Sequence, residues 1–453
     1  MPLSRKPLFI FCAMLGIAAA VQAQTAPPHD IVISNATVMT VTHGTMEHAS
    51  VWVHDGKIAG FGPTVGAPAD AVKVDASGKF LTPGIIDPHS HSALDSDVNE
   101  ATSPVTPSMM MIDAFDNRDK ALYQALAGGV TTELLLHGSA NMIGGQAVVI
   151  KNKFGFERDA MLFPNAPRSI KFASGENPKR VYGSRDQLPS TRMGNFEVMR
   201  QSFEDAKAYM AKWEAYNAKV ARAQKDGKDG GSIAEIEKPG VDLKLEALAD
   251  VLRGKLYVQI HCYRADEYLT EEAIAKEYGY KIRAFHHALE MYKVAPRIAA
   301  DGTAIATFAD WWGYKDEAWD AIPWNAVMSM RAGVKVALKS DSNDYVRRLN
   351  QEAGKMVHYG SATEEEALRM ITLNPAWIIG VDDKVGSIDV GKDADLVIWN
   401  MDPLSTYART EKVYIDGDLF FDSSLPGFGT THFNGVMHDA GGFGGDDGDE
   451  GGN

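Results

Sequence analysis

The feature that most constrains the fold is an alternation of short apolar segments with helix-prone segments between residues 83 and 383. Eight apolar stretches have the length of buried strands, and they end at Ile86, Leu136, Val149, Phe172, Ile260, Phe285, Phe308 and Leu338. Helix-prone segments separate most of them, at residues 113–127, 267–278, 289–300, 324–331 and 345–358. Eight strands with intervening helices predict an α/β fold, a (β/α)8 (TIM) barrel.

Two segments depart from this alternation. The third unit, residues 152–168, contains no clear helix. Residues 195–226 are long, charged and poor in helix breakers, and this pattern predicts an extended helix or a helical insertion.

Short β-like stretches separated by turn residues occupy both ends of the chain. They lie between residues 31 and 82, and again between residues 394 and 417. We expect residues 24–82 and 384–425 to combine into one small β-sandwich beside the barrel. This pairing is a hypothesis, because periodicity does not show which strands are hydrogen-bonded to one another.

The N-terminus has the pattern of an export signal. Arg5 and Lys6 precede an apolar run, and Val21 and Ala23 place small residues before a cut at Gln24. The run is too short for a comfortable membrane span. We therefore predict a cleavable signal peptide at residues 1–23 and a periplasmic or secreted protein. The Gly- and Asp-rich tail, residues 438–453, is predicted to be disordered.

Composition excludes several classes of partner. The formal net charge of −15 disfavours nucleic acid and anionic membrane surfaces, which need clustered positive charge. We expect a small-molecule substrate and no membrane contact after signal cleavage. The composition is compatible with a homo-oligomer. Removal of the signal leaves Cys262 as the one cysteine, so core size or metal must stabilise the exported chain in place of an internal disulfide.

Candidate metal ligands follow the predicted strands. His89 and His91 stand two residues apart at the end of the first barrel strand, so both side chains point to one face. His261 ends the fifth strand, the pair His286-His287 ends the sixth, and Asp341 follows the eighth. Because the strand ends of a barrel meet at one mouth, these residue types predict a divalent-metal site there.

Three motifs give a more specific indication. They are TPGIIDPHSH at residues 82–91, GGVTT at 128–132 and GSIDVGKDADL at 386–396. In these motifs the chain resembles the amidohydrolase superfamily, especially its imidazolonepropionase-like and Xaa-carboxypeptidase-like branch, over roughly residues 30–423. The resemblance implies a (β/α)8 barrel with a composite sandwich from both termini.

The resemblance also implies roles for these residues. His89, His91 and Asp341 would bind one metal, and His261 and a sixth-strand histidine would bind a second. A carboxylated lysine would bridge the two ions, with Lys171 as the candidate and Glu176 as an alternative carboxylate. We expect two zinc ions, although manganese or another divalent ion is compatible with these ligands.

The sixth strand offers two histidines in succession. In a regular strand His286 and His287 cannot both face the interior. We choose His287 as the ligand, because the segment that follows it resembles the one after the family's ligand. His286 is then expected to pack between strand and helix or to line the pocket.

The expected chemistry is hydrolysis of a C–N bond. Two divalent ions lower the pKa of a shared water. Asp341 is the predicted catalytic residue, which accepts the water's proton and passes it to the leaving group. His137, Arg192 and Arg264 are candidate substrate contacts, since a guanidinium suits a carboxylate. Ordinary surface salt bridges explain either arginine equally well.

Several alternatives remain at this stage. Hydrolysis of a cyclic amide, as by imidazolonepropionase, is open, although an exported enzyme better suits peptides or N-acyl amino acids. A deaminase is disfavoured, because Arg264 occupies the position where those enzymes carry a glutamate. A non-catalytic binding barrel is disfavoured, because every expected ligand position is filled.

Overall fold

A computed structural model describes residues 29–95, 97–228 and 233–425 of the chain. The expected signal peptide (1–23) and the glycine-rich tail (438–453) lie outside the described residues. Within the described part, no helix has both the length and the apolar character needed to span a bilayer.

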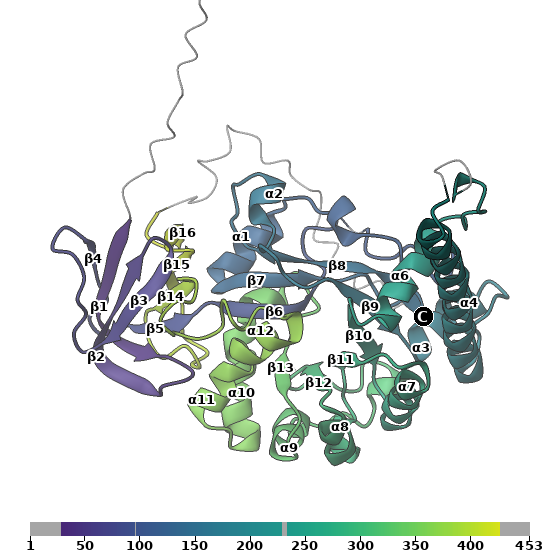
Figure 1. The fold of residues 1–453 in the computed structure, drawn as a ribbon. Helices are drawn as coiled ribbons and strands as arrows, with labels where there is room; N and C mark the ends of the chain where they lie inside the picture. The colour runs from purple at the N-terminus through teal and green to yellow at the C-terminus, as the bar shows by residue number, and fades with distance from the viewer. Residues whose placement is uncertain (1–28, 96, 229–232, 426–453) are drawn as a thin grey trace, which may run out of the picture.

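All eight apolar segments of the central region are strands of one sheet that curls into a nearly closed barrel (Figure 1). The strands, in chain and sheet order, are β6 (Ile85–Ser90), β7 (Val130–Leu135), β8 (Ile143–Lys151), β9 (Ser169–Ala173), β10 (Tyr257–Cys262), β11 (Ile282–His287), β12 (Ala304–Thr307) and β13 (Val336–Leu338). The first and last strands approach at their ends, where the Asp341 N–H donates to the His89 carbonyl at 3.0 Å. Polar groups that follow β13 are thereby placed beside those of β6.

The barrel departs from a strict (β/α)8 pattern at β8, which runs antiparallel to both β7 and β9. The connection from β7 to β8, residues 136–142, contains no helix. A parallel crossover needs a dozen or more residues, so a connection this short returns the chain antiparallel. The predicted strict alternation is therefore wrong at this unit. The next connection, residues 152–168, holds one short helix, α2 (Arg158–Met161).

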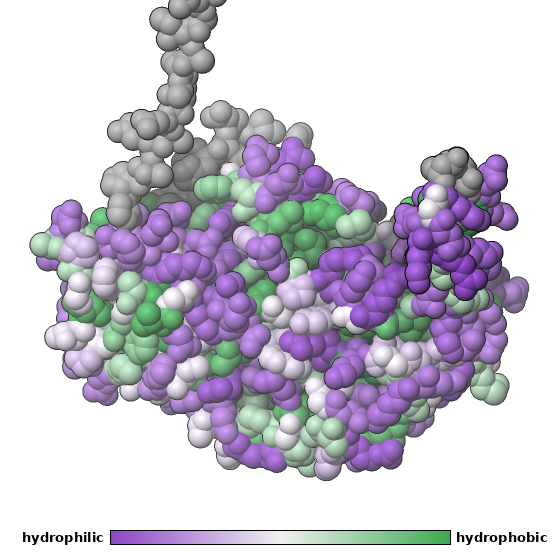
Figure 2. Space-filling model, in the orientation of Figure 1, coloured by the Kyte–Doolittle hydropathy of each residue, from purple (hydrophilic) through white to green (hydrophobic). Residues whose placement is uncertain are grey.

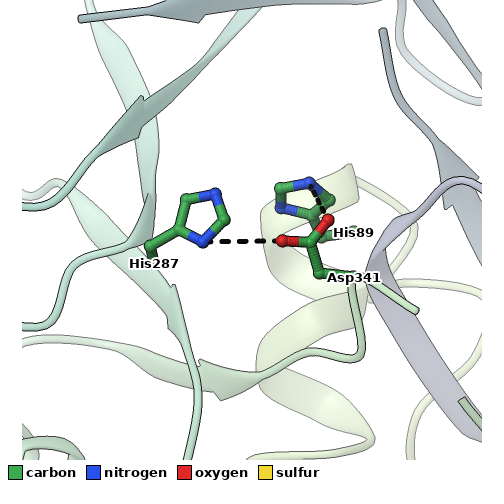
Figure 3. A group of neighbouring side chains, drawn as sticks. All are labelled: His89, His287 and Asp341. Atoms are coloured by element: carbon green, nitrogen blue, oxygen red, sulfur yellow. Dashed lines mark ion pairs between the residues drawn. The ribbon is translucent and has the colours of Figure 1, made fainter. Parts of the chain in front are cut away.

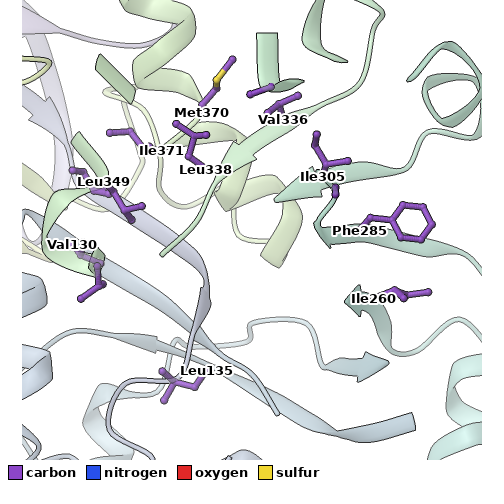
Figure 4. Close-up of a cluster of buried hydrophobic side chains, with 14 of the residues drawn as sticks. Val130, Leu135, Ile260, Phe285, Ile305, Val336, Leu338, Leu349, Met370 and Ile371 are labelled. Atoms are coloured by element: carbon purple, nitrogen blue, oxygen red, sulfur yellow. The ribbon is translucent and has the colours of Figure 1, made fainter. Parts of the chain in front are cut away.

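Helices cover the outside of the barrel, and each predicted helical segment contains one, although α1 and α8 begin several residues later than predicted. They are α1 (Lys120–Ala127), α7 (Ala265–Tyr278), α8 (Ala295–Asp301), α9 (Asn325–Arg331) and α10 (Leu349–Gly360), with α3 (Glu176–Gly183), α6 (Leu243–Leu252), α11 (Glu364–Arg369) and α12 (Leu373–Ile379) in addition. Apolar side chains of strands and helices pack between the two layers, and Val130, Phe285 and Leu349 belong to this core (Figure 4). Each strand is therefore held from outside, and its end projects polar residues into the mouth.

The predicted long helix is α4 (Arg192–Lys225). It begins where the Thr191 side chain accepts a hydrogen bond from the Gly194 N–H, a standard N-cap. Its first half packs on the barrel through Met199 and Phe203, both fully buried. Its second half projects from the body, and hydrophilic side chains cover the projecting end (Figures 1 and 2).

Strands from both ends of the chain form a second sheet (Figure 1). The N-terminal strands are β1 (Asp30–Met39), β2 (Thr45–His54), β3 (Lys57–Gly62), β4 (Val72–Asp75) and β5 (Phe80–Pro83), and the C-terminal ones are β14 (Leu396–Trp399), β15 (Thr410–Ile415) and β16 (Asp418–Asp422). β5 pairs antiparallel with β14 and so joins the two groups. Hydrogen bonds connect all eight strands, so strands from the two ends of the chain form one unit. The long strand β1, irregular after Ile33, pairs with β4 and with β5 along one edge.

A buried lysine connects the barrel to this second sheet. Lys151, at the end of β8, lies 2.7 Å from Asp393 and 3.2 Å from Asp395, and it also contacts Asp416. Burial alone would lower the pKa of Lys151, but the three carboxylates raise it above its ordinary value. Removing one member of such a network leaves the other charges buried and unpaired.

Lys151→Met is therefore expected to lower the free energy of unfolding by about 3–5 kcal/mol. Lys153→Met is the matched control, since Lys153 pairs with Asp416 from a partly exposed position. Its expected cost is below about 1 kcal/mol. Urea denaturation followed by circular dichroism measures both, and equal effects of the two substitutions would contradict a buried junction.

Candidate metal centre

The two histidines of the HSH motif and the aspartate after β13 meet at the barrel mouth. Figure 3 shows His89 and Asp341 there, with His287 on the other side of the aspartate. Nε2 of His89 lies 3.3 Å from Nε2 of His91. Both of these nitrogens lie 3.2 Å from Oδ1 of Asp341. His89 lies in strand β6 and His91 directly follows it. The hydrogen bond between the His89 carbonyl and the Asp341 N–H fixes the aspartate beside them. Three potential ligand atoms thus share one small volume.

Lys171 joins the same group from β9. Its side chain is fully buried, and Nζ lies 3.3 Å from Nε2 of His89 and 3.4 Å from the carbonyl of His137. The alternative carboxylate, Glu176, is the first residue of helix α3. Glu176 lies near Glu317, a different acidic residue, whose pKa is raised to about 7 by burial, by Glu267 and by Glu176. The geometry therefore favours Lys171 over Glu176 as a neighbour of His89.

His261 and His287 form a second pair at the ends of β10 and β11. Their ring centroids are 4.2 Å apart. Nδ1 of His261 lies 2.7 Å from the Ser139 hydroxyl, and Nδ1 of His287 lies 3.1 Å from the Tyr263 hydroxyl. The Nε2 atoms of both histidines are buried and have no hydrogen-bond partner among the described residues. An unpartnered buried nitrogen is costly unless a further group completes it.

Both histidines of the sixth strand reach the interior, contrary to the expectation for a regular strand. Nδ1 of His286 lies 2.9 Å from Nδ1 of His89, while Nδ1 of His287 lies 3.5 Å from Oδ2 of Asp341. His287 has a φ of +68° and Ala288 a φ of +50°, so the alternation of an extended strand ends there. The expectation that only one of the two histidines faces the interior is wrong, because this left-handed turn redirects His287 while His286 reaches the interior beside His89.

Left-handed backbone occurs at three residues of this region. Besides His287 and Ala288, Asp341 has a φ of +51°. Non-glycine residues rarely adopt such angles, and the strain persists where surrounding structure enforces it, often at functional sites. The three residues adjoin the cluster, so this strain belongs to its construction.

A second buried lysine, which we did not predict, touches the aspartate. Nζ of Lys339 lies 2.9 Å from Oδ2 of Asp341 and 3.9 Å from the ring centroid of Phe308. Lys339 precedes Asp341 by two residues, the same spacing that joins His89 to His91. That spacing is the signal by which it could have been found.

Electrostatics favour the neutral form of three buried histidines and the ionised form of the aspartate. Burial, with the nearby lysine charges, holds the pKa of His89, His261 and His287 well below the ordinary histidine value. Burial alone would raise the pKa of Asp341, but the Lys339 ammonium beside it acts in the opposite direction and helps to hold that pKa well below its usual range. Neutral imidazoles and an ionised carboxylate are the forms that bind metal ions.

The cluster fits a divalent metal ion. His89, His287 and Asp341 each offer one ligand atom within 4.8 Å of the others, and the cluster adds His91 and the unpartnered Nε2 of His261. Imidazole nitrogens with a carboxylate oxygen are the donor set typical of zinc and related ions.

The three predicted substrate contacts are held by neighbours in this structure. Nε of Arg192 lies 2.7 Å from Glu267, and Nε of Arg264 lies 3.0 Å from Asp266. His137 is buried near Lys171, donates from Nδ1 to the Gly138 carbonyl at 3.0 Å, and has a pKa lowered by burial to about 4. Both arginines therefore already have carboxylate partners.

An aromatic layer with a cation on it adjoins the histidine pair. Tyr263 stacks on His287, with ring centroids 4.6 Å apart, and Nζ of Lys315 lies 4.0 Å from the Tyr263 centroid. Nζ of Lys315 also lies 3.1 Å from Oδ1 of Asn177. Burial lowers the pKa of His261, and the charge of Lys315 lowers it further. Lys315 lies in the loop after β12 and not at a strand end, so the pattern of strand ends did not predict that it lies near the histidines.

Comparisons with known proteins decide the family. A solved amidohydrolase from Thermotoga maritima is 38% identical, superposes with a TM-score of 0.78, and is matched over 86% of this chain and 100% of its own. The chain belongs to the amidohydrolase family. The family model for the Amidohydrolase family also matches, at residues 324–431.

Two curated relatives widen the comparison for this amidohydrolase. It is 36% identical over 387 residues to amidohydrolase tasK of Hapsidospora irregularis, covering 80% of this chain but 38% of that protein. The chain thus spans well under half the length of that relative. It is 24% identical over 417 residues to the imidazolonepropionase of Thermoplasma volcanium, 83% of this chain and 91% of the relative, which agrees with the branch that its motifs indicate. The family membership makes it a hydrolase that acts on C–N bonds.

Proposed function

We propose that this amidohydrolase is an exported, metal-dependent enzyme that hydrolyses the amide or peptide-like bond of a small substrate. One observation carries the proposal. His89, His91 and Asp341 place ligand atoms 3.2–3.3 Å apart, beside His261 and His287, whose buried Nε2 atoms have no partner among the described residues. Export rests on the pattern of residues 1–23 alone.

The residues divide into two sets of candidate ligands. His89, His91 and Asp341 would hold one ion, and His261 and His287 would hold a second. Lys171, as a carbamate, would bridge them. Bound divalent ions lower the pKa of water and polarise a carbonyl group.

Asp341 is the proposed proton acceptor. Its Oδ1 faces His89 and His91, so Oδ2 is the oxygen that would accept the proton of the attacking water and return it to the leaving nitrogen. Lys339 lies 2.9 Å from Oδ2 and keeps the carboxylate ionised before the proton arrives. Phe308 and Tyr263 exclude water around these groups, since both are buried.

The position of Lys315 favours a substrate that carries a carboxylate. Among the described residues no carboxylate oxygen lies within 4 Å of its Nζ, whereas Arg192 and Arg264 are paired. Its ammonium lies on the ring of Tyr263, which itself stacks on His287. A dipeptide or N-acyl amino acid could therefore place its carboxylate on Lys315 while its amide faces the histidines.

Lys315→Met is expected to raise KM for such a substrate by about 10-fold or more, because a charge-assisted hydrogen bond is lost. The kcat should change little, since Lys315 does not touch the reacting bond. Arg264→Met, which removes a cation already paired with Asp266, is the matched control and should leave KM nearly unchanged. Equal KM values for wild type and Lys315→Met would remove Lys315 from substrate binding.

The function is tested with the mature protein purified in zinc or manganese. Metal content is measured by mass spectrometry, and activity is screened against dipeptides, N-acyl amino acids and cyclic amides, with and without a chelator. We expect two ions per chain and hydrolysis that the chelator abolishes. Fewer than one ion per chain would refute the two-metal proposal, and preference for a cyclic amide would favour imidazolonepropionase-type chemistry.

A further inference from the structure

A chain of buried hydrogen bonds runs from helix α12 to the first metal-ligand candidate. Nε2 of Gln259 donates to the Ile378 carbonyl at 3.3 Å, and Oε1 of Gln259 lies 2.8 Å from Nε2 of His286. Nδ1 of His286 in turn lies 2.9 Å from Nδ1 of His89. Gln259, His286 and His89 are each fully buried, so no solvent competes for these contacts.

The direction of every proton in this chain follows from its first member. The Ile378 carbonyl can only accept, so it fixes the Gln259 amide with NH₂ toward Ile378 and oxygen toward His286. Nε2 of His286 must then carry the proton, which leaves its Nδ1 as an acceptor. Nδ1 of His89 donates to that acceptor, and Nε2 of His89 retains its lone pair.

We propose that Gln259 and His286 are positioning residues that hold His89 in the tautomer whose bare Nε2 faces Lys171, His91 and Asp341. This inference rests on the proposed metal-dependent function. In the other tautomer Nε2–H of His89 would donate to Oδ1 of Asp341, 3.2 Å away. That hydrogen bond would occupy two candidate ligands at once, and it would have to break before a metal ion could bind.

His89 needs this arrangement more than its neighbour does. His91 donates from Nδ1 to the Leu136 carbonyl at 2.9 Å, an acceptor whose role is fixed by its chemistry. The partner of His89 is another imidazole, which can donate or accept at the same atom. The tautomer of His286 must therefore be set by a further residue, and Gln259 is the residue that sets it.

The first test compares two nearly isosteric substitutions. Asn places an acceptor oxygen close to the position of the His286 Nδ1 atom, whereas Leu has the same size and no acceptor. Zinc affinity of the metal-free full-length protein, measured by competition with a chromophoric chelator, should fall by about 10–100-fold in His286→Leu. His286→Asn should stay close to wild type. Equal losses in both variants would overturn the proposal, since they would indicate a packing effect alone.

The second test reads the tautomer without metal. Nitrogen NMR of the histidine rings in the metal-free protein should show Nδ1 of His89 protonated and Nε2 bare in wild type. Gln259→Met, which removes the acceptor for His286, should populate the opposite tautomer, and Gln259→Glu should preserve the original one. An unchanged His89 signal in Gln259→Met would overturn the proposal. If wild type bound no zinc, the proposed function would fail, while this spectroscopic test would still stand.

Discussion

Asp341→Asn is expected to lower kcat by a factor of about 10²–10⁴, the contribution of a positioned general base. The amide retains the size of the carboxylate but cannot accept the water's proton. The substitution should also preserve the backbone, because Asp341 has a φ of +51° and asparagine tolerates this left-handed conformation well. Loss of turnover would therefore report the lost proton acceptor.

Steady-state kinetics on the best substrate of the screen measures this effect, and metal content is determined on the same preparation. The side-chain amide of the variant would keep a ligand oxygen toward His89 and His91, so we expect bound metal to be retained. Asp344→Asn is the control, because Asp344 pairs with Arg347 at an exposed position nearby and should leave kcat unchanged. Retention of most activity in Asp341→Asn would remove Asp341 from the role of base.

The strands of the barrel were predictable because buried strands are apolar whatever their direction. Val149 and Phe172 marked β8 and β9 correctly as buried segments. The antiparallel course of β8 was not predictable from its composition, since apolar side chains are needed in either direction. The direction of β8 is set by the short connection 136–142, which leaves no room for a crossover helix.

The same distinction applies to the site. His89, His261 and Asp341 were found because regular strands place their ends at one mouth, and the structure brings them together. The interior position of both His286 and His287 was not predictable, because the left-handed turn at His287 is a tertiary feature that no alternation of residues predicts. Lys315 lies in a loop, where the spacing of residues along the sequence does not predict which way a side chain points.

The net charge of the cluster depends on the chemical form of Lys171. If Lys171 is an ammonium ion, the cluster holds two lysine cations, Lys171 and Lys339, against one carboxylate, Asp341. That excess of positive charge opposes a divalent cation. Carbon dioxide can remove it: the Nζ lone pair of neutral Lys171 forms an N–C bond, a C=O electron pair moves to oxygen, and Nζ loses a proton. The resulting carbamate anion would leave the cluster with net negative charge, and bound cations would stabilise it in return.

Lys171→Met is accordingly expected to lower bound metal from two ions to one or fewer per chain and kcat by about 10²-fold or more, since a charged ligand and part of the water activation are lost. Methionine fills the same buried space, so circular dichroism should show a folded protein. Isotope-labelled bicarbonate should give a carbamate carbon signal in wild type that is absent from Lys171→Met. Glu176→Gln is the matched control and should change neither metal content nor the carbamate signal. If Glu176→Gln lost metal while Lys171→Met kept two ions, Glu176 would be the bridging carboxylate and Lys171 a buried structural lysine.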